Sequence, residues 1–306
     1  MVKEGDNNEA KAYGHCHQKN ARRRGIRCDQ RAAAADRHVA YPLVYAISCS
    51  FSSPLLVVQS KVYLLPKGLT TIAYERVFNN QQILTGYKNT VFYTLLGTAI
   101  NIILTTMTAY PLSRRDFKAR KFITFLFTFT MLFSGGLIPT FLVVRNLGLM
   151  NTVWALILPG AISSWNMFIM KNYFQTSIPG ELYEAARIDG ADNMKILFQL
   201  VLPLSMPILA VMVLYYGVAH WNSYFSALVY IRDTDRYPLQ LVMRNFFSGQ
   251  DYVEQGAGGD DATQMLLLNE TMKYALIVIA SVPMLILYPL LQRFFVKGVM
   301  LGAIKG

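Results

Sequence analysis

The sequence predicts an all-α integral membrane protein with about six transmembrane helices, the first of them short or incomplete, and three observations support this. Of the 306 residues, 53% are apolar and only 15% are charged, whereas soluble domains carry about a quarter charged residues. The mean hydropathy is positive, at +0.30. Several uncharged runs also approach the roughly 20 apolar residues that a helix needs to cross a bilayer core of about 30 Å. Lipid is therefore the expected solvent for most of the chain.

Five charge-free runs predict five membrane spans. They cover residues 89–113, 122–144, about 153–170, about 206–230 and 274–292. An amphipathic approach that ends near Pro203 precedes the fourth of them. Small residues and prolines inside the runs are expected to mark bends and points of close packing. These are Gly135, Gly136, Pro139, Pro283 and Pro289.

The N-terminal span is expected to be short. Residues 39–51 are apolar but number about half of what a span requires. Asp36, Arg37 and His38 precede them directly, and a charge at the bilayer centre costs about 3 kcal/mol or more. The helix must therefore stay short, use residues 54–60, or lack its first half. Upstream, residues 1–38 hold nine Lys/Arg and five acids and predict a basic, disordered cytoplasmic arm before a membrane domain at 39–306.

The basic residues predict the orientation of the chain. Residues 113–121 contain five Lys/Arg in nine positions, and such short basic loops stay in the cytoplasm. Alternation then places both termini and residues 171–195 inside, and the loops at 54–87, 145–152 and 231–273 outside. Of the net charge of +11, residues 1–38 contribute +4, and the other +7 is spread over short loops between apolar runs, which argues against a nucleic-acid-binding face.

No motif predicts catalysis or a bound metal in this chain. The sequence contains no G-x-x-x-x-G-K-[ST], H-E-x-x-H or G-x-S-x-G pattern. Three cysteines, Cys16, Cys28 and Cys49, have no framework spacing for disulfides. His15, Cys16 and His17 with Cys28 fit no standard zinc pattern. We therefore expect no catalytic residue, no metal and no cofactor in the chain.

The loop at 171–204 predicts a helix–turn–helix. Pro179 suits a first helical turn, and a helix is expected from there to Ile188. Gly190 is expected to supply a tight turn that a side chain would obstruct, with Asp189 capping the next helix. This second, amphipathic helix, over 191–201, would lead into the membrane. Taken alone, this pattern also fits an ordinary interfacial amphipathic hairpin.

A long spaced motif lies within this loop. It reads Glu184, Ala185, Ala186, Asp189, Gly190, Ala191, Phe198, Leu200, Leu202, Pro203 and Pro207. It resembles the EAA signature of binding-protein-dependent ABC importer permeases, E-A-A-x-x-D-G-A followed by Phe, Ile and Leu-Pro, with Leu200 where Ile is usual. The resemblance runs from Tyr41 to Gly306. Relatives carry a full first membrane helix, so we expect an altered reading frame or a misassigned start upstream of Tyr41.

The resemblance implies a role and a set of partners. In the family this loop is a coupling helix that docks in a cleft of a cytoplasmic ATPase. Glu184 would pair with a basic residue of that ATPase, and Gly190 would set the bend. The partners implied are a second homologous permease subunit, an ATPase dimer that binds ATP and Mg, and an extracytoplasmic solute-binding protein. The chain would then be a multi-pass protein of the bacterial cytoplasmic membrane, without a nucleotide site of its own.

Within the family, the chain is similar to the carbohydrate-uptake, MalG-like branch. The Y-P-L-Q run and the C-terminal K-G-V-M-L-G-A-I-K-G resemble most the second permease subunit of alginate and oligosaccharide importers. In relatives of this type the C-terminal tail can reach the ATPase, so residues 297–306 are expected to do so here. A loop before the last span can probe the binding protein, which makes the Gly-rich residues 255–261 a partner site or, alternatively, a flexible linker.

Polar and aromatic residues inside the predicted spans are candidates for contacting a sugar. They are Trp165, Asn166, Tyr216, His220, Trp221 and Asn222. Sugars offer CH faces for stacking and hydroxyls for hydrogen bonds. The alternative is that Trp and Tyr lie in interfacial belts and that Asn or His bonds across helices.

Two other functions stay open at the level of sequence. One keeps the family and changes the cargo to a non-sugar solute. The other is an ion-coupled secondary transporter, which would be expected to carry buried acids within its spans. No Asp or Glu lies inside the five predicted spans, which argues against it.

Overall fold

The computed structural model describes residues 41–248 and 260–303, and side chains within 41–248 and 267–292. The described residues form helices and turns and no strand, as the sequence predicts. Two helices, Gln81–Ser113 and Leu267–Gln292, are long and apolar enough to cross a membrane, and up to four spans result if each of two bent helix pairs counts as one. The predicted arm at 1–38 lies outside the described residues, as does most of the Gly-rich stretch at 255–261.

The chain divides into two compact units, and the first comprises Met1–Glu75 with Gly259–Val278. Residues 41–50 are helical, and the chain then turns before the short helix α2 (Pro54–Val58). Cys49 and Val57 pack together with Val62 in a small core. The described part of the predicted first helix is therefore helical, its start lies outside the described residues, and residues 54–60 do not extend it, because the chain turns at 51–53.

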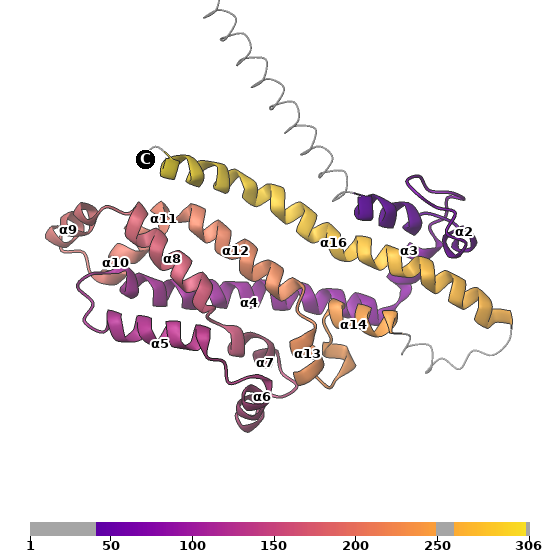
Figure 1. Ribbon diagram of the computed structural model, residues 1–306, viewed down its shortest axis with the longest axis horizontal. Coiled ribbons are helices and arrows are strands. Elements are labelled where there is room, and N and C mark those ends of the chain that lie inside the picture. The colour runs from indigo at the N-terminus through magenta and orange to yellow at the C-terminus, as the bar shows by residue number, and fades with distance from the viewer. Residues whose placement is uncertain (1–40, 249–259, 304–306) are drawn as a thin grey trace, which may run out of the picture. The chain divides into compact units, whose positions relative to one another are not determined.

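The second unit comprises Arg76–Gly258 with Ile279–Gly306 and is built around α4 (Gln81–Ser113), which follows α3 (Ile72–Asn79). Asn80 caps α4, because its side-chain oxygen accepts from the backbone N–H groups of Gln82 and Ile83 at 3.0 and 3.2 Å. Figure 1 shows α4 with three helices beside it. These are α8 (Ser164–Ser177), α12 (Met206–Trp221) and α14 (Leu239–Phe247).

The predicted span at 122–144 is wrong as one continuous helix. It consists of α5 (Arg120–Leu132) and α6 (Leu137–Asn146), whose axes differ by 117°. The break lies at the expected glycine pair, where Gly136 has a φ of +86° that favours glycine. The bend expected from the sequence is therefore present, and it is sharp enough to separate two helices.

Two more predicted spans are wrong as single helices. Residues 153–170 contain α7 (Val153–Ile157), the 3₁₀ turn η1 (Leu158–Gly160) and the start of α8. Pro159 lacks an N–H, and Ser163 starts a new helix by accepting from the Asn166 N–H at 3.4 Å. Residues 206–230 end one helix, α12, at Trp221 and begin another, α13 (Phe225–Tyr230). Interrupted helices therefore replace the uniform spans that hydropathy predicts.

Residues 232–238 form a loop that, with the first residue of α14, is bound to α4 at the end away from Ser113. The Asn89 side chain donates to the carbonyls of Asp235 and Tyr237 at 2.7 and 3.1 Å. The Leu239 N–H donates to the Thr90 hydroxyl at 2.7 Å. The loop contains the 3₁₀ turn η3 (Thr234–Arg236) and leads into α14. The last helix described, α16, covers Asp260–Ala303.

Candidate functional site

The motif loop begins with α9 (Gly180–Ile188), the helix at the left edge of Figure 1. Pro179 occupies its N-cap position and Glu181 lies in its first turn, where a carboxylate is favourable. At the other end the N–H groups of Asp189 and Ala191 donate to the carbonyls of Ala185 and Ala186 at 3.0 and 2.9 Å. The turn after α9 is thus held by the motif's own backbone.

Gly190 is required for a different reason from the one predicted. Its φ is +73°, a left-handed conformation that costs other residues about 1–2 kcal/mol. A Cβ at this position would meet nothing within 4 Å, so space does not exclude a side chain. The capping prediction is also wrong, because Asp189 ends α9 and Asp192 occupies the N-cap position of the next helix.

The second half of the loop is a composite helix. It consists of α10 (Asn193–Ile196), the π-helical turn η2 (Leu197–Val201) and α11 (Leu202–Leu204). Its buried residues Ile196, Leu197 and Val201 join the main hydrophobic core. The chain then bends by 82° into α12, which begins at Met206 as predicted. The Leu202-Pro203 pair therefore lies directly before this bend.

Most of the motif residues predicted to meet a partner are accessible. Glu184, Ala185, Asp189, Gly190 and Pro203 are exposed, while Ala186, Ala191 and Leu202 are partly buried. Ile188 was not among the predicted residues, yet it is 86% exposed at the end of α9. This exposed apolar side chain enlarges the accessible surface that the motif residues form on α9. Its place at the second x of E-A-A-x-x-D-G-A could have indicated this from the sequence.

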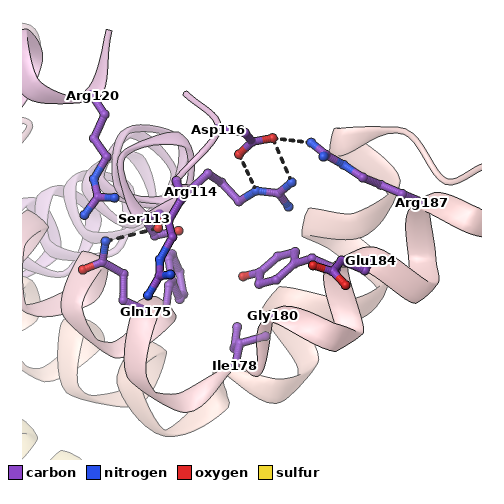
Figure 2. A pocket seen from close by; sticks show the side chains of 12 residues that line it. Ser113, Arg114, Asp116, Arg120, Gln175, Ile178, Gly180, Glu184 and Arg187 are labelled. Carbon is purple, nitrogen blue, oxygen red and sulfur yellow. Dashed lines mark hydrogen bonds and ion pairs between the residues drawn. The ribbon is translucent and has the colours of Figure 1, made fainter. Parts of the chain in front are cut away.

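A cavity of about 550 Å³ lies between α9 and the end of α4 (Figure 2). Asp116 connects its two sides, since it forms ion pairs with Arg114 at 3.2 Å and with Arg187 of α9. The Arg114 guanidinium also lies 4.4 Å from the centre of the Tyr183 ring, and this geometry is favourable for a cation–π contact. Gln175 donates to the Ser113 carbonyl at 3.1 Å. Sequence reasoning noted the basic run at 113–121 but missed this contact with the motif loop.

The electrostatics of this cavity favour fixed charges. The hydrogen bond from Arg114 lowers the pKa of Asp116 far below its usual range, against the opposing effect of partial burial, and Arg187 lowers it further. Burial raises the pKa of Tyr183 to about 12, so its hydroxyl stays protonated. The Asp116 network therefore holds α9 against the end of α4 with charges that do not change near neutral pH.

The candidate sugar contacts inside the helices are mostly engaged with other parts of the chain. The His220 ring nitrogen Nε2 lies 3.0 Å from the Asn101 amide nitrogen of α4. The Tyr216 hydroxyl bonds to the Thr105 hydroxyl at 2.7 Å, and it accepts from the Ser163 N–H at 3.3 Å. These bonds join α12 to α4 and to the start of α8.

The remaining candidates divide into buried and exposed ones. The buried Trp221 indole donates to the Ala280 carbonyl at 3.0 Å, and Asn166 is buried as well. Trp165 is 60% exposed, while the exposed Asn222 donates to the Val218 carbonyl of its own helix at 3.0 Å. The structure thus leaves Trp165 as the open aromatic candidate. Sequence reasoning missed Asn101 and Thr105, which the i, i+4 spacing of polar residues in an apolar run indicates.

Comparison with known proteins identifies relatives along most of the chain. Residues 83–301 match the family model described as binding-protein-dependent transport system inner membrane component. The chain is 43% identical over 270 residues to the polygalacturonan/rhamnogalacturonan transport system permease protein YtcP of Bacillus subtilis, covering 87% of this chain and 92% of the relative. It is 42% identical over 265 residues to the protein LplC of the same organism, covering 87% and 89%.

A solved structure is similar over nearly the whole length. It is the crystal structure of a bacterial ABC transporter involved in the import of the acidic polysaccharide alginate. The similarity has a TM-score of 0.81 and 34% identity, and it covers 90% of this chain and 98% of the matched chain. With the motif loop, the broken helices and these matches together, the chain belongs to the family of inner membrane components of binding-protein-dependent transport systems.

Proposed function

We propose that this chain is a translocating subunit of an ATP-driven oligosaccharide importer in the bacterial cytoplasmic membrane. It pairs with a second permease subunit, receives solute from an external binding protein and docks α9 on a cytoplasmic ATPase dimer, which binds the ATP and Mg. Both termini and residues 171–204 face the cytoplasm. The observation that carries the proposal is α9, a short helix whose accessible Glu184 and Ala185 lie in the E-A-A-x-x-D-G-A spacing.

The mechanism depends on how α9 is held. Three connections join it to the membrane helices: the chain from α8, the composite helix into α12, and the Asp116 ion network to α4. Closure of the ATPase dimer displaces α9, and these connections move α4, α8 and α12 with it. Each state of the importer is favoured only by its differential contacts with nucleotide, binding protein and sugar.

A matched pair of α9 variants tests the coupling role. In the assembled complex, Glu184→Lys should lower the ATPase activity stimulated by the loaded binding protein by at least about tenfold, since truncating or reversing one partner of an interfacial charge pair costs about 2–5 kcal/mol. Glu181→Lys, in the same helix and also exposed, is the control and should retain most of that activity. Equal activity in both variants would contradict docking through Glu184.

We further propose that the cargo is an oligosaccharide containing acidic sugars. Support comes from the relative named for polygalacturonan transport and from the solved transporter involved in alginate import. The described parts of α4, α8 and α12 also contain no Asp or Glu that would repel a carboxylate. Relatives at about 28–30% identity are named for arabino- and galactooligosaccharides, so neutral oligosaccharides are the second candidate.

Stimulation of the ATPase activity by candidate cargoes tests the substrate class. The complex with its binding protein should respond to uronate oligosaccharides and respond less to neutral ones of equal length. A response to neutral oligosaccharides alone would support the second candidate. A response only to an amino acid or a metal chelate would exclude sugar import.

A further inference from the structure

A second cavity, of about 740 Å³, lies between α5 and α8 and is strongly basic. Its charged lining comes from Arg115, Lys118, Arg120, Lys121 and Lys171, with Asp116 as the one carboxylate. Asp116 is already paired with Arg114 and Arg187. The cavity wall therefore carries five cations and no unpaired carboxylate that could neutralise them.

Lys171 and Arg120 are the two partly buried cations of this cavity. Lys171 lies on α8, and its Nζ is 3.5 Å from the Thr124 hydroxyl of α5 and 5.5 Å from the centre of the Phe168 ring. The ion pairs found in the described part of the chain do not include it. A partly buried cation carries a desolvation cost that an anion in the cavity would compensate.

The uncharged side of this cavity is formed by α5. Phe125 and Thr128 of α5 line it beyond the cations. Phe125 is 63% exposed, and α5 has no buried residue. The lining thus changes from basic to uncharged along the first turns of α5, and the exposed Phe125 offers an apolar side chain there, as an acyl chain beside a lipid headgroup would need.

We propose that this cavity binds the phosphate of an anionic phospholipid, with Lys171, Arg120 and their basic neighbours on the phosphate and Phe125 beside an acyl chain. The inference rests on the proposed function for its orientation, because it requires residues 113–121 to face the cytoplasmic leaflet. Basic pockets at the cytoplasmic ends of transmembrane helices are known to take such headgroups. A bound lipid would fill the space between α5 and α8 and compensate the charge of Lys171.

Native mass spectrometry of the assembled complex tests the proposal. The complex is purified in neutral detergent after exposure to phosphatidylglycerol or to phosphatidylcholine vesicles. Wild type should retain phosphatidylglycerol in preference to phosphatidylcholine. Lys171→Gln and Arg120→Gln should each weaken this retention about fivefold, the factor expected for removing one cation near an anionic lipid. Arg145→Gln, an exposed arginine of α6 without an ion pair in the described residues, is the control and should bind as wild type does.

Three results would overturn the lipid site. One is equal retention of phosphatidylglycerol in Lys171→Gln, Arg120→Gln and Arg145→Gln. A second is retention of inorganic phosphate alone to the same extent as phosphatidylglycerol, which would assign the cavity to a free anion. Lipid retention is measured without transport, and assembly with the ATPase is visible in the same spectra. The third result, an assembled wild-type complex that retains no phosphatidylglycerol, would therefore refute this site alone, whereas failure to assemble would refute the proposed function.

Discussion

The motif loop and the helix interior differ in what surrounds the residues that sequence reasoning selected. On α9, Glu184 and Ala185 are exposed to whatever docks there. In the interior, Tyr216 and Trp221 are buried, and their polar atoms already bond to other parts of the chain. A spaced motif thus pointed to an available surface, whereas residue chemistry alone pointed mainly to bonds between helices.

Each region also depends on one glycine, for opposite reasons. Gly97 of α4 is packed against α12, and a Cβ there would lie 2.6 Å from the His220 ring. Gly190 has open space around it but a φ of +73°. The interior therefore needs a missing side chain, and the loop needs a backbone conformation. Substitutions at these two positions separate the two requirements.

The largest effect is expected at Gly97. Gly97→Leu forces α4 and α12 apart or displaces His220 from Asn101, and overpacking of this kind costs about 1–3 kcal/mol or more. The assembled complex should unfold at a clearly lower temperature, and less of it should survive purification. Gly160→Leu is the control, because a Cβ at that site meets nothing within 4 Å. Equal thermal stability of the two variants would refute the close contact.

Gly190→Ala should leave stability nearly unchanged but weaken coupling. The left-handed conformation costs alanine about 1–2 kcal/mol, a factor of about 5–30 in the population of the docked loop geometry. ATPase activity stimulated by the binding protein should fall accordingly in the assembled complex. Gly190→Asn should fall less, because Asn tolerates this conformation.

The control for this loop is Gly180→Ala. Gly180 has open space around it and an ordinary φ, so alanine is tolerated there on both counts. Its coupled ATPase activity should stay at the wild-type level. If Gly190→Ala matched it, the conformation of the turn would not matter for coupling.

A pair of interior variants separates helix bonds from sugar contacts. Tyr216→Phe removes the hydroxyl between Thr105 and the Ser163 N–H, and such interhelical bonds contribute about 0.6 kcal/mol on average. It should lower thermal stability slightly and leave the cargo concentration for half-maximal ATPase stimulation unchanged. Trp165→Ala removes an exposed ring and should do the reverse. A changed half-maximal cargo concentration in Tyr216→Phe, with none in Trp165→Ala, would contradict this distinction.

The sequence predicted the helical class well because lipid imposes it: backbone groups in hydrocarbon must bond within a helix or a barrel. It also located the loop turn at Gly190 and the start of α12 at Met206. Hydropathy could not predict the breaks after Ile157 and Trp221, because both lie inside apolar runs. Apolar composition does not reveal that Pro159 lacks an N–H or that Ser163 caps a new helix.

The site was less predictable, because its contacts join residues distant in sequence. Asp116 and Arg187 are 71 positions apart and come together only when α9 lies against the end of α4. Asn101 and His220 are 119 apart. The type of each residue shows whether it can form an ion pair or a hydrogen bond. Only the packing of the helices determines which residue is its partner.

The smallest effect is expected from Asp116→Asn, which removes the ion network between the loop and α4. The Asp116 side chain is 47% exposed, and exposed ion pairs contribute at most about 1 kcal/mol, so coupled ATPase activity should fall no more than about fivefold. Because the hydrogen bond from Arg114 lowers the pKa of Asp116, its contribution is complete above the unfolded value of about 3.9 and is lost only as pH falls through the lowered folded value. The ratio of wild-type to variant activity should therefore stay constant between about pH 5 and 8 and shrink with added salt, which screens exposed charges. The double variant Asp116→Arg with Arg187→Asp should restore part of the activity. A ratio that changed with pH over this range would show that Asp116 titrates there and that the network does not hold α9 as a fixed connection.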